Sequence, residues 1–258
     1  MRTFKLTLAY DGTAYAGWQS QPGEPTLQGA LEKALEKITG QSVRTVASGR
    51  TDSGVHALGQ VVSFPVDTPL APDVLQRALN AELPHDMAVV DAAEAPPGFH
   101  AIRDARRKRY RYMIHNARIH DVFLRRYAWH VYEPLDMALM HTAAQALVGT
   151  HDFSSFETQG SLRETSVRTV YELSVRGGEP SGDAEESRGA DRIIIEIEAD
   201  GFLYNMVRAI VGTLVEVGRG AKPATWPAEA LAAQSRRSAG PTAPPQGLFL
   251  VIVTYADS

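Results

Sequence analysis

The sequence contains no cysteine among its 258 residues. Disulfide bridges and metal sites built from thiolates are therefore excluded. It also contains no run of about 18 apolar residues that would span a membrane. Its first residues lack both the long apolar stretch and the small-residue cleavage site of a signal peptide. We therefore expect a cytoplasmic protein without a membrane segment.

Several signatures of common active sites are also missing. The phosphate-binding patterns GxxxxGK[ST] and GxGxxG do not occur, and neither does the GxSxG pattern of many nucleophilic serines. The 8 histidines form no HExxH or similar ligand pattern. A metal-dependent hydrolase would need Asp52 and His56 together with distant histidines, namely His85, His100, His115 or His151. We expect no metal site.

Charge is distributed unevenly along the chain, although the formal net charge is only −4. Residues 103–111 read RDARRKRYR and are almost entirely basic, whereas residues 179–191 are mainly acidic. A basic run is often only solvated surface, but tyrosine interrupts this one and nucleic-acid phosphates would be attracted to it. The candidate contacts to a nucleic-acid backbone are Arg103, Arg106, Arg107, Lys108, Arg109 and Arg111.

The hydrophobic pattern of the first half predicts the order β-α-β-β-α-β. Residues 3–10 alternate and place Phe4, Leu6, Leu8 and Tyr10 on one face of a strand. Thr26 is a suitable N-cap for the helix that follows, and Gly40 suits its end. The predicted strands are 3–10, 42–48, 59–66 and 87–95, and the predicted helices are 25–40 and 71–83.

The second half repeats this order without recognisable sequence identity between the halves. In residues 191–199 the pattern places Ile193, Ile195, Ile197 and Ala199 on the inward face of a strand. The predicted strands are 108–115, 167–176, 191–199 and 246–256, and the predicted helices are 134–149 and 202–218. Residues 177–190 are expected to form a long hairpin loop.

We therefore predict an α+β protein built from two tandem ferredoxin-like βαββαβ units. The predicted units are residues 1–105 and 106–258, joined into one mostly antiparallel platform with a central cleft. The first unit would carry the loop with Asp52. The second would carry Tyr110 and Arg208 in the cleft.

The segment SGRTDSGVHA, residues 48–57, places Arg50, Asp52 and His56 in one tight loop between two strands. An Asp at this spacing from Gly is often only a turn former. A neighbouring Arg, however, keeps a carboxylate ionised, and an ionised carboxylate is a nucleophile or a general base. Asp52 is therefore the first candidate for catalysis.

Two further segments carry candidate residues. Tyr110 lies inside the basic run, where its ring is either part of the core or a platform for a displaced base. In GFLYNMVR, Tyr204 and Arg208 are i,i+4 neighbours on a helix, and Gly212 extends the same stripe. A glycine there would let another backbone approach closely, as in the wall of a cleft.

Five segments in this order resemble the tRNA pseudouridine synthase A family over nearly the whole chain. They are YDGTAYAGWQSQP, SGRTDSGVHALGQV, RKRYRYMI, GTHDFSSF and FLYNMVRAIVGTLVEVGRG. The resemblance implies the tandem-unit fold and an isomerase that converts uridine at positions 38, 39 and 40 of the tRNA anticodon stem-loop. It also implies a homodimer with RNA crossing between subunits, and no cofactor or metal.

The resemblance assigns roles to particular positions. Asp52 falls on the catalytic aspartate, Tyr110 on the active-site tyrosine and Arg208 on the basic residue that pairs with the aspartate. Arg50 falls on an arginine implicated in extruding the target base. We expect further substrate contacts from His56, Tyr204 and Asn205.

Residues 99–104 depart from the family pattern, and other functions would explain part of the sequence. FHAIRD stands where FHARF is common, so Ile102 replaces an Arg and Asp104 adds a negative charge. A non-catalytic RNA-binding module, a metal-dependent hydrolase and an assembly protein are the alternatives. The first alternative would leave Asp52 without a task. The sequence leaves open whether Asp52 would attack the sugar or the base.

Overall fold

The computed structural model describes residues 1–158, 165–178 and 191–256. By their contacts they form two compact units, Met1–Arg106 with Phe249–Ser258 (unit 1) and Arg107–Leu248 (unit 2). Both units combine helices with sheets whose strand pairs are mostly antiparallel, so the predicted α+β class is confirmed. Most of the expected acidic loop, 179–190, lies outside the described residues.

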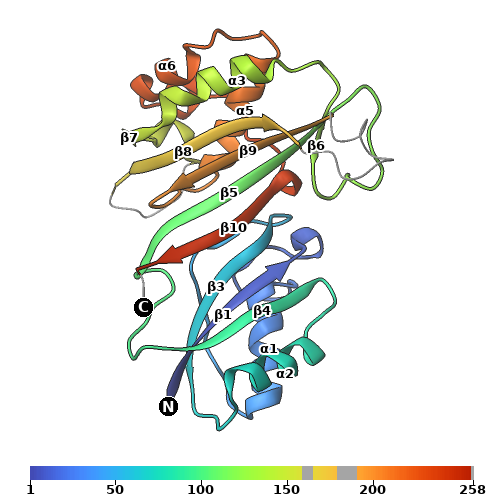
Figure 1. Ribbon diagram of the computed structural model, residues 1–258, viewed down its shortest axis with the longest axis vertical. Helices are drawn as coiled ribbons and strands as arrows, with labels where there is room; N and C mark the ends of the chain where they lie inside the picture. The colour runs from blue at the N-terminus through green and yellow to red at the C-terminus, as the bar shows by residue number, and fades with distance from the viewer. Residues whose placement is uncertain (159–164, 179–190, 257–258) are drawn as a thin grey trace. The chain divides into compact units, whose positions relative to one another are not determined.

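Unit 1 has the predicted βαββαβ order. Its sheet has the strand order β4-β1-β3-β10, and β2 pairs with β3. Helices α1 and α2 lie side by side over one face of this sheet (Figure 1). The elements are β1 (Arg2–Tyr10), η1 (Gly12–Ala14), α1 (Leu27–Thr39), β2 (Val46–Ala47), β3 (His56–Val66), α2 (Pro72–Glu82), β4 (Met87–Ala95) and β10 (Leu248–Tyr255).

The predicted faces of β1 and α1 form the core of this unit. Phe4, Leu6 and Leu8 are fully buried in β1, while the residues between them are more exposed. The Thr26 side chain accepts a hydrogen bond from the Gly29 amide at 3.3 Å and so caps α1. The helix then buries Leu27, Leu31 and Leu35 against the sheet, which fixes the segments before and after it.

The last strand differs from the prediction. The sequence pattern places it in the second repeat, but its contacts group Phe249–Ser258 with unit 1. The reason is that β10 pairs in parallel with β3, with Phe249 opposite His56 and Leu250 opposite Ala57. Its apolar alternation predicts a strand but does not specify this partner.

Unit 2 has a sheet in the order β5-β9-β8-β7, with β6 parallel to β5. Helices α3, α5 and α6 lie together on one side of this sheet (Figure 1). Its strands are β5 (Ala105–Asn116), β6 (Trp129–Val131), β7 (Gly149–Asp152), β8 (Val167–Gly177) and β9 (Arg192–Ala199). Its helices are α3 (Met137–Ala144), η2 (Gln145–Leu147), η3 (Ser154–Phe156), α5 (Met206–Gly218), α6 (Trp226–Ala233), η4 (Arg236–Ser238) and η5 (Pro245–Gly247).

The predicted pairing of the two strands that flank the acidic segment is confirmed, because β8 and β9 are antiparallel neighbours. The inward face of β9 is also as predicted, with Ile193, Ile195, Ile197 and Ala199 buried. The short strands β6 and β7 and helix α6 were not predicted. None of the helices in the described part of the chain is long and apolar enough to cross a membrane.

Candidate active site

The candidate nucleophile lies in the loop of residues 48–55, here called the Asp52 loop, which joins β2 to β3 in unit 1. Thr51 is buried, Asp52 is half-buried and Arg50 is exposed. The Val55 amide donates to the Asp52 carbonyl at 3.1 Å and closes a tight turn. The turn leaves the Asp52 carboxylate partly accessible while its backbone is fixed.

Hydrogen bonds from buried side chains of β1 and β3 hold residues 48–51 of this loop. Gln60 is fully buried in β3, donates to the Gly49 carbonyl at 2.7 Å and accepts from the Ser48 hydroxyl at 2.7 Å. The hydroxyls of Tyr10 and Thr51 are 2.8 Å apart. Burial raises the pKa of Tyr10 to about 12, although the hydrogen bonds with Thr51 and Gln60 lower it. These buried polar groups have hydrogen-bond partners, and such a network favours a single conformation of the loop.

Residues 12–18, here called the strap, hold the loop from the other side. The Trp18 amide donates to the Thr51 carbonyl at 2.9 Å, and the Ser53 hydroxyl donates to the Tyr15 carbonyl at 2.9 Å. Gly17 has φ +107°, and a Cβ there would lie 2.9 Å from the Thr51 oxygen. Only glycine permits this approach, so the strap and the loop are locked together.

His56 lies beneath the loop and is only 1% exposed. Its Nδ1 is 3.1 Å from both the Gly12 amide nitrogen and the Asp11 Oδ1. Its ring stacks on Phe249 with centroids 4.7 Å apart. These contacts enclose the His56 side chain and give it a supporting position beneath the loop, because the first residue of β3 points inward. The expected substrate contact by His56 remains a prediction.

Unit 2 contains the second group of candidate residues. Tyr110 on β5 lies largely buried, and its ring meets Phe202 edge-on with centroids 4.9 Å apart. Tyr204 is 46% exposed just before α5. The predicted role of Tyr110 in stacking on a base remains a prediction.

Arg208 is fixed in the first turn of α5. Its Nε donates to the Ala243 carbonyl at 2.7 Å and its Nη1 donates to Asn205 Oδ1 at 2.8 Å. The Ala243 amide in turn donates to the Arg208 carbonyl at 3.0 Å. A Cβ on Gly212 would lie 1.8 Å from the Pro241 carbonyl oxygen, which confirms that Gly212 admits a neighbouring backbone. The expected pairing of Arg208 with Asp52 joins two different units and remains a prediction.

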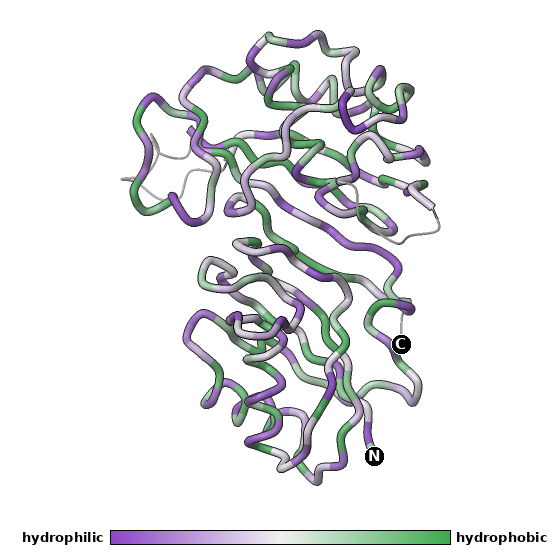
Figure 2. Tube along the Cα trace, turned by 180° about the vertical axis from the view of Figure 1, so that it is seen from behind, coloured by the Kyte–Doolittle hydropathy of each residue, from purple (hydrophilic) through white to green (hydrophobic). Residues whose placement is uncertain are grey.

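The basic run meets acidic partners that the sequence reading missed. Arg109 lies opposite Glu198, and Arg111 lies opposite Glu196, in the β5–β9 ladder. The ion pairs are Arg107–Glu198 at 3.0 Å, Arg109–Glu198 at 3.1 Å, Arg109–Glu172 at 2.8 Å and Arg111–Glu196 at 2.6 Å. The start of β5 is the hydrophilic purple strand in Figure 2. Phosphates would have to compete with these carboxylates.

Contacts within residues 98–104 account for the charge that departs from the family pattern there. Ile102 is 54% exposed, and the side chain of Asp104 accepts from the His100 amide at 2.8 Å and from Arg103 at 3.1 Å. These two hydrogen bonds hold the pKa of Asp104 below its ordinary value. The added negative charge therefore serves this turn, and it also engages Arg103.

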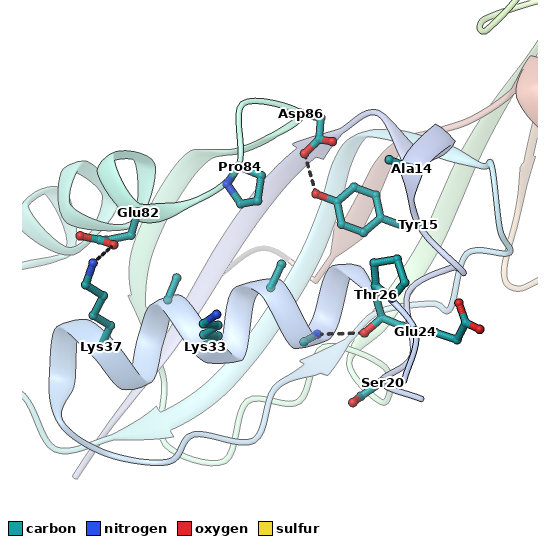
Figure 3. A pocket seen from close by; sticks show the side chains of 14 residues that line it. Ala14, Tyr15, Ser20, Glu24, Thr26, Lys33, Lys37, Glu82, Pro84 and Asp86 are labelled. Atoms are coloured by element: carbon teal, nitrogen blue, oxygen red, sulfur yellow. Dashed lines mark hydrogen bonds and ion pairs between the residues drawn. The ribbon is translucent and has the colours of Figure 1, made fainter. Parts of the chain in front are cut away.

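A groove of about 840 Å³ lies on the helical side of unit 1 and contains none of the predicted site residues. Figure 3 shows Lys37 of α1 paired with Glu82 across it, and Tyr15 directed at Asp86. The Tyr15 hydroxyl donates to Asp86 Oδ1 at 2.5 Å. Because Tyr15 belongs to the strap, this groove adjoins the segment that supports the Asp52 loop. Across the described residues, no group of three His, Asp or Glu side chains forms a metal site.

Comparison with known proteins finds sequence similarity to one family over most of the chain. Residues 7–103 and 143–256 match the model of a family described as tRNA pseudouridine synthase. A tRNA pseudouridine synthase A from Moorella thermoacetica is 48% identical, covering 99% of this chain and all of the relative. Those from Thermoanaerobacter sp. (strain X514) and Myxococcus xanthus are 45% and 46% identical, covering 99% and 100% of this chain, and 100% and 93% of the relative.

Proposed function

Because the chain belongs to the tRNA pseudouridine synthase family, we propose that it isomerises uridines 38, 39 and 40 of the tRNA anticodon stem-loop, with Asp52 as the nucleophile. Membership makes the chain an isomerase of tRNA uridine. The stem-loop positions and the role of Asp52 are the proposed part. The observation that supports the role of Asp52 is a half-buried carboxylate on a loop whose backbone is held on two sides. The stem-loop positions rest on the resemblance of the sequence segments alone.

The chemistry requires a target uridine that has left its stack, which costs a few kcal/mol. Arg50 is exposed on the Asp52 loop and would occupy the vacated space or hold the displaced backbone. Tyr110 would stack on the extruded base. These roles leave Asp52 to act at the sugar or the ring.

Asp52 has three routes to the same product. Its carboxylate attacks C1′, adds to C6 of the ring or removes the C2′ proton. In each route the N1–C1′ bond breaks, the ring turns and a C5–C1′ bond forms. The bond from Asp52 to C1′ or C6 then breaks, or the proton taken from C2′ returns to that carbon, and the carboxylate is regenerated. The proton on C5 then leaves to a base, with Asp52 or Tyr110 as candidates, and N1 gains a proton. Arg208 would keep Asp52 ionised and oriented.

The test is release of tritium from tRNA that carries uridine labelled at C5. Asp52→Asn should lose turnover by about 10³-fold or more while tRNA binding stays nearly intact. Asp73→Asn is the matched control, since Asp73 is exposed on α2 and pairs with Arg77 across one helical turn. Wild-type turnover in Asp52→Asn would refute the nucleophile.

The same assay separates the main alternative, a non-catalytic RNA-binding module. Such a module would bind tRNA without releasing tritium.

The proposal also includes a cytoplasmic homodimer as the working form. Sedimentation velocity should give twice the chain mass, and a monomer with full activity would remove the dimer from the proposal.

A further inference from the structure

Asn205 has an unusual backbone conformation. Its φ is +60° and its ψ is 8°, in the left-handed region, and only Gln234 shares a positive φ among the described non-glycine residues. This conformation is costly for most side chains, although Asn tolerates it better than others. Such conformations persist where the surrounding structure requires them, often at functional sites.

The side chain of Asn205 does not perform its usual task. Asn205 is the N-cap of α5, a position where Asn commonly accepts a hydrogen bond from an amide of the first turn. Here the side chain makes no such capping bond. Instead its Nδ2 donates to Thr158 Oγ1 at 3.1 Å, and its Oδ1 accepts from Arg208 Nη1 at 2.8 Å. Both ends of the amide are therefore used, and one of them holds the guanidinium.

The second anchor of Arg208 is also fixed. The Nε of Arg208 donates to the Ala243 carbonyl, and the Ala243 amide donates to the Arg208 carbonyl. The neighbouring Pro244 carbonyl accepts from the hydroxyl of Tyr112, a fully buried residue of β5. Two acceptors on different segments thus set the plane of the guanidinium, since its donors have a rigid geometry.

We propose that Asn205 is a positioning residue that aims Arg208, and that its left-handed backbone exists to point its amide along the helix at Nη1. This inference rests on the proposed function, because it matters for catalysis only if Arg208 orients the nucleophile. It differs from the sequence expectation, in which Asn205 contacts the substrate. Its amide is directed to Thr158 and Arg208.

Two substitutions separate the backbone from the amide. Asn205→Gly keeps the left-handed conformation at low cost but removes the contact with Arg208. We expect its melting temperature and its Kd for tRNA to stay close to wild type, while kcat falls about 10-fold, equivalent to about 1.4 kcal/mol. Asn205→Asp keeps an acceptor for Arg208 and should recover most of kcat.

Gln234→Gly is the matched control, since it makes the same change at the other positive-φ position and should leave kcat unchanged. Thr158→Val removes the other partner of the Asn205 amide and should lower kcat by a smaller factor. If Asn205→Gly fails to fold, Thr158→Val together with Asn205→Asp still tests the inference. Wild-type kcat in both Asn205→Gly and Thr158→Val would overturn it.

Other outcomes are equally informative. Weaker tRNA binding with unchanged kcat in Asn205→Gly would overturn the inference in favour of a substrate contact. Equal loss of kcat in the Gly and Asp variants would also overturn it. Failure of the proposed function is distinct, because the wild-type protein would then release no tritium. Wild-type kcat in Arg208→Ala would show that Arg208 has no role in catalysis, and Asn205 would then have no guanidinium to position for it.

Discussion

At the scale of single residues, Gln60 is a fully buried side chain that holds two residues of the Asp52 loop. Replacing Gln60 by Leu would remove its hydrogen bonds with the Ser48 hydroxyl and the Gly49 carbonyl. Loss of a buried hydrogen-bond partner costs about 1–3 kcal/mol, so Gln60→Leu should lower the free energy of unfolding by about that amount. Its kcat should also fall, because the loop would no longer keep one arrangement.

Urea unfolding and tritium release measure the two effects. Gln76→Leu is the control, because Gln76 on α2 donates a half-buried hydrogen bond to the Val89 carbonyl of β4, away from the Asp52 loop in sequence. It should destabilise less and leave kcat unchanged. Full kcat in Gln60→Leu would show that the buried network does not order the loop.

Sequence reasoning at this scale identified residues with chemical character but not their supports. Asp52 was found because Arg50 and His56 share its loop. Gln60 was missed because its partners, the Ser48 hydroxyl and the Gly49 carbonyl, are known only once the strands pair. The burial of His56 was missed for a related reason, since the direction of a side chain depends on where β3 begins.

At the scale of elements, the ladder between β5 and β9 makes a pH-dependent contribution to stability. Glu198 is 13% exposed and pairs with Arg107 and Arg109. Burial alone would raise the pKa of Glu198, but the hydrogen bonds from both arginines outweigh it and the pKa lies below its ordinary 4.5. A depressed folded-state pKa stabilises the protein above the unfolded value, and this contribution is lost as the pH falls through the folded pKa.

Glu198→Gln should therefore be less stable than wild type at neutral pH, and the difference should shrink as the pH drops below 4.5. Urea unfolding at several pH values measures this. Glu94→Gln is a control at the other sheet, where Glu94 pairs with Arg2 and is 48% exposed, so its effect should be smaller. A difference for Glu198→Gln that persists unchanged at low pH would exclude its charge as the cause.

Elements with strong periodicity were predicted and weak ones were not. The alternation in β1 and the helical spacing in α1 follow from one buried face each. Strands β6 and β7 are short, so they offer too few residues for a period. The glutamates opposite the basic run were missed because register across β5 and β9 joins residues about 90 positions apart.

At the scale of the whole molecule, the average charge and the local charge give different expectations for RNA. A net charge of −4 does not favour nonspecific attraction to RNA, so binding should depend on a small number of unneutralised cations. Within the described residues, Arg106 is exposed and has no ion pair. Arg107 pairs with Glu198 and lies 4.1 Å over the ring of Tyr171. These neighbours in sequence should therefore differ in their contribution to binding.

The salt dependence of tRNA binding tests this difference. Each phosphate contact adds about 0.7 to 0.9 to the slope of log K against log salt, so Arg106→Gln should reduce the slope by about that amount. Arg107→Gln should leave the slope nearly unchanged and lower stability instead, because it removes the partner of Glu198. Fluorescence anisotropy with labelled tRNA over a salt series measures both slopes. If Arg107→Gln lowered the slope as much as Arg106→Gln, the glutamate would not neutralise Arg107 toward RNA, and the whole basic run would act as one phosphate-binding surface.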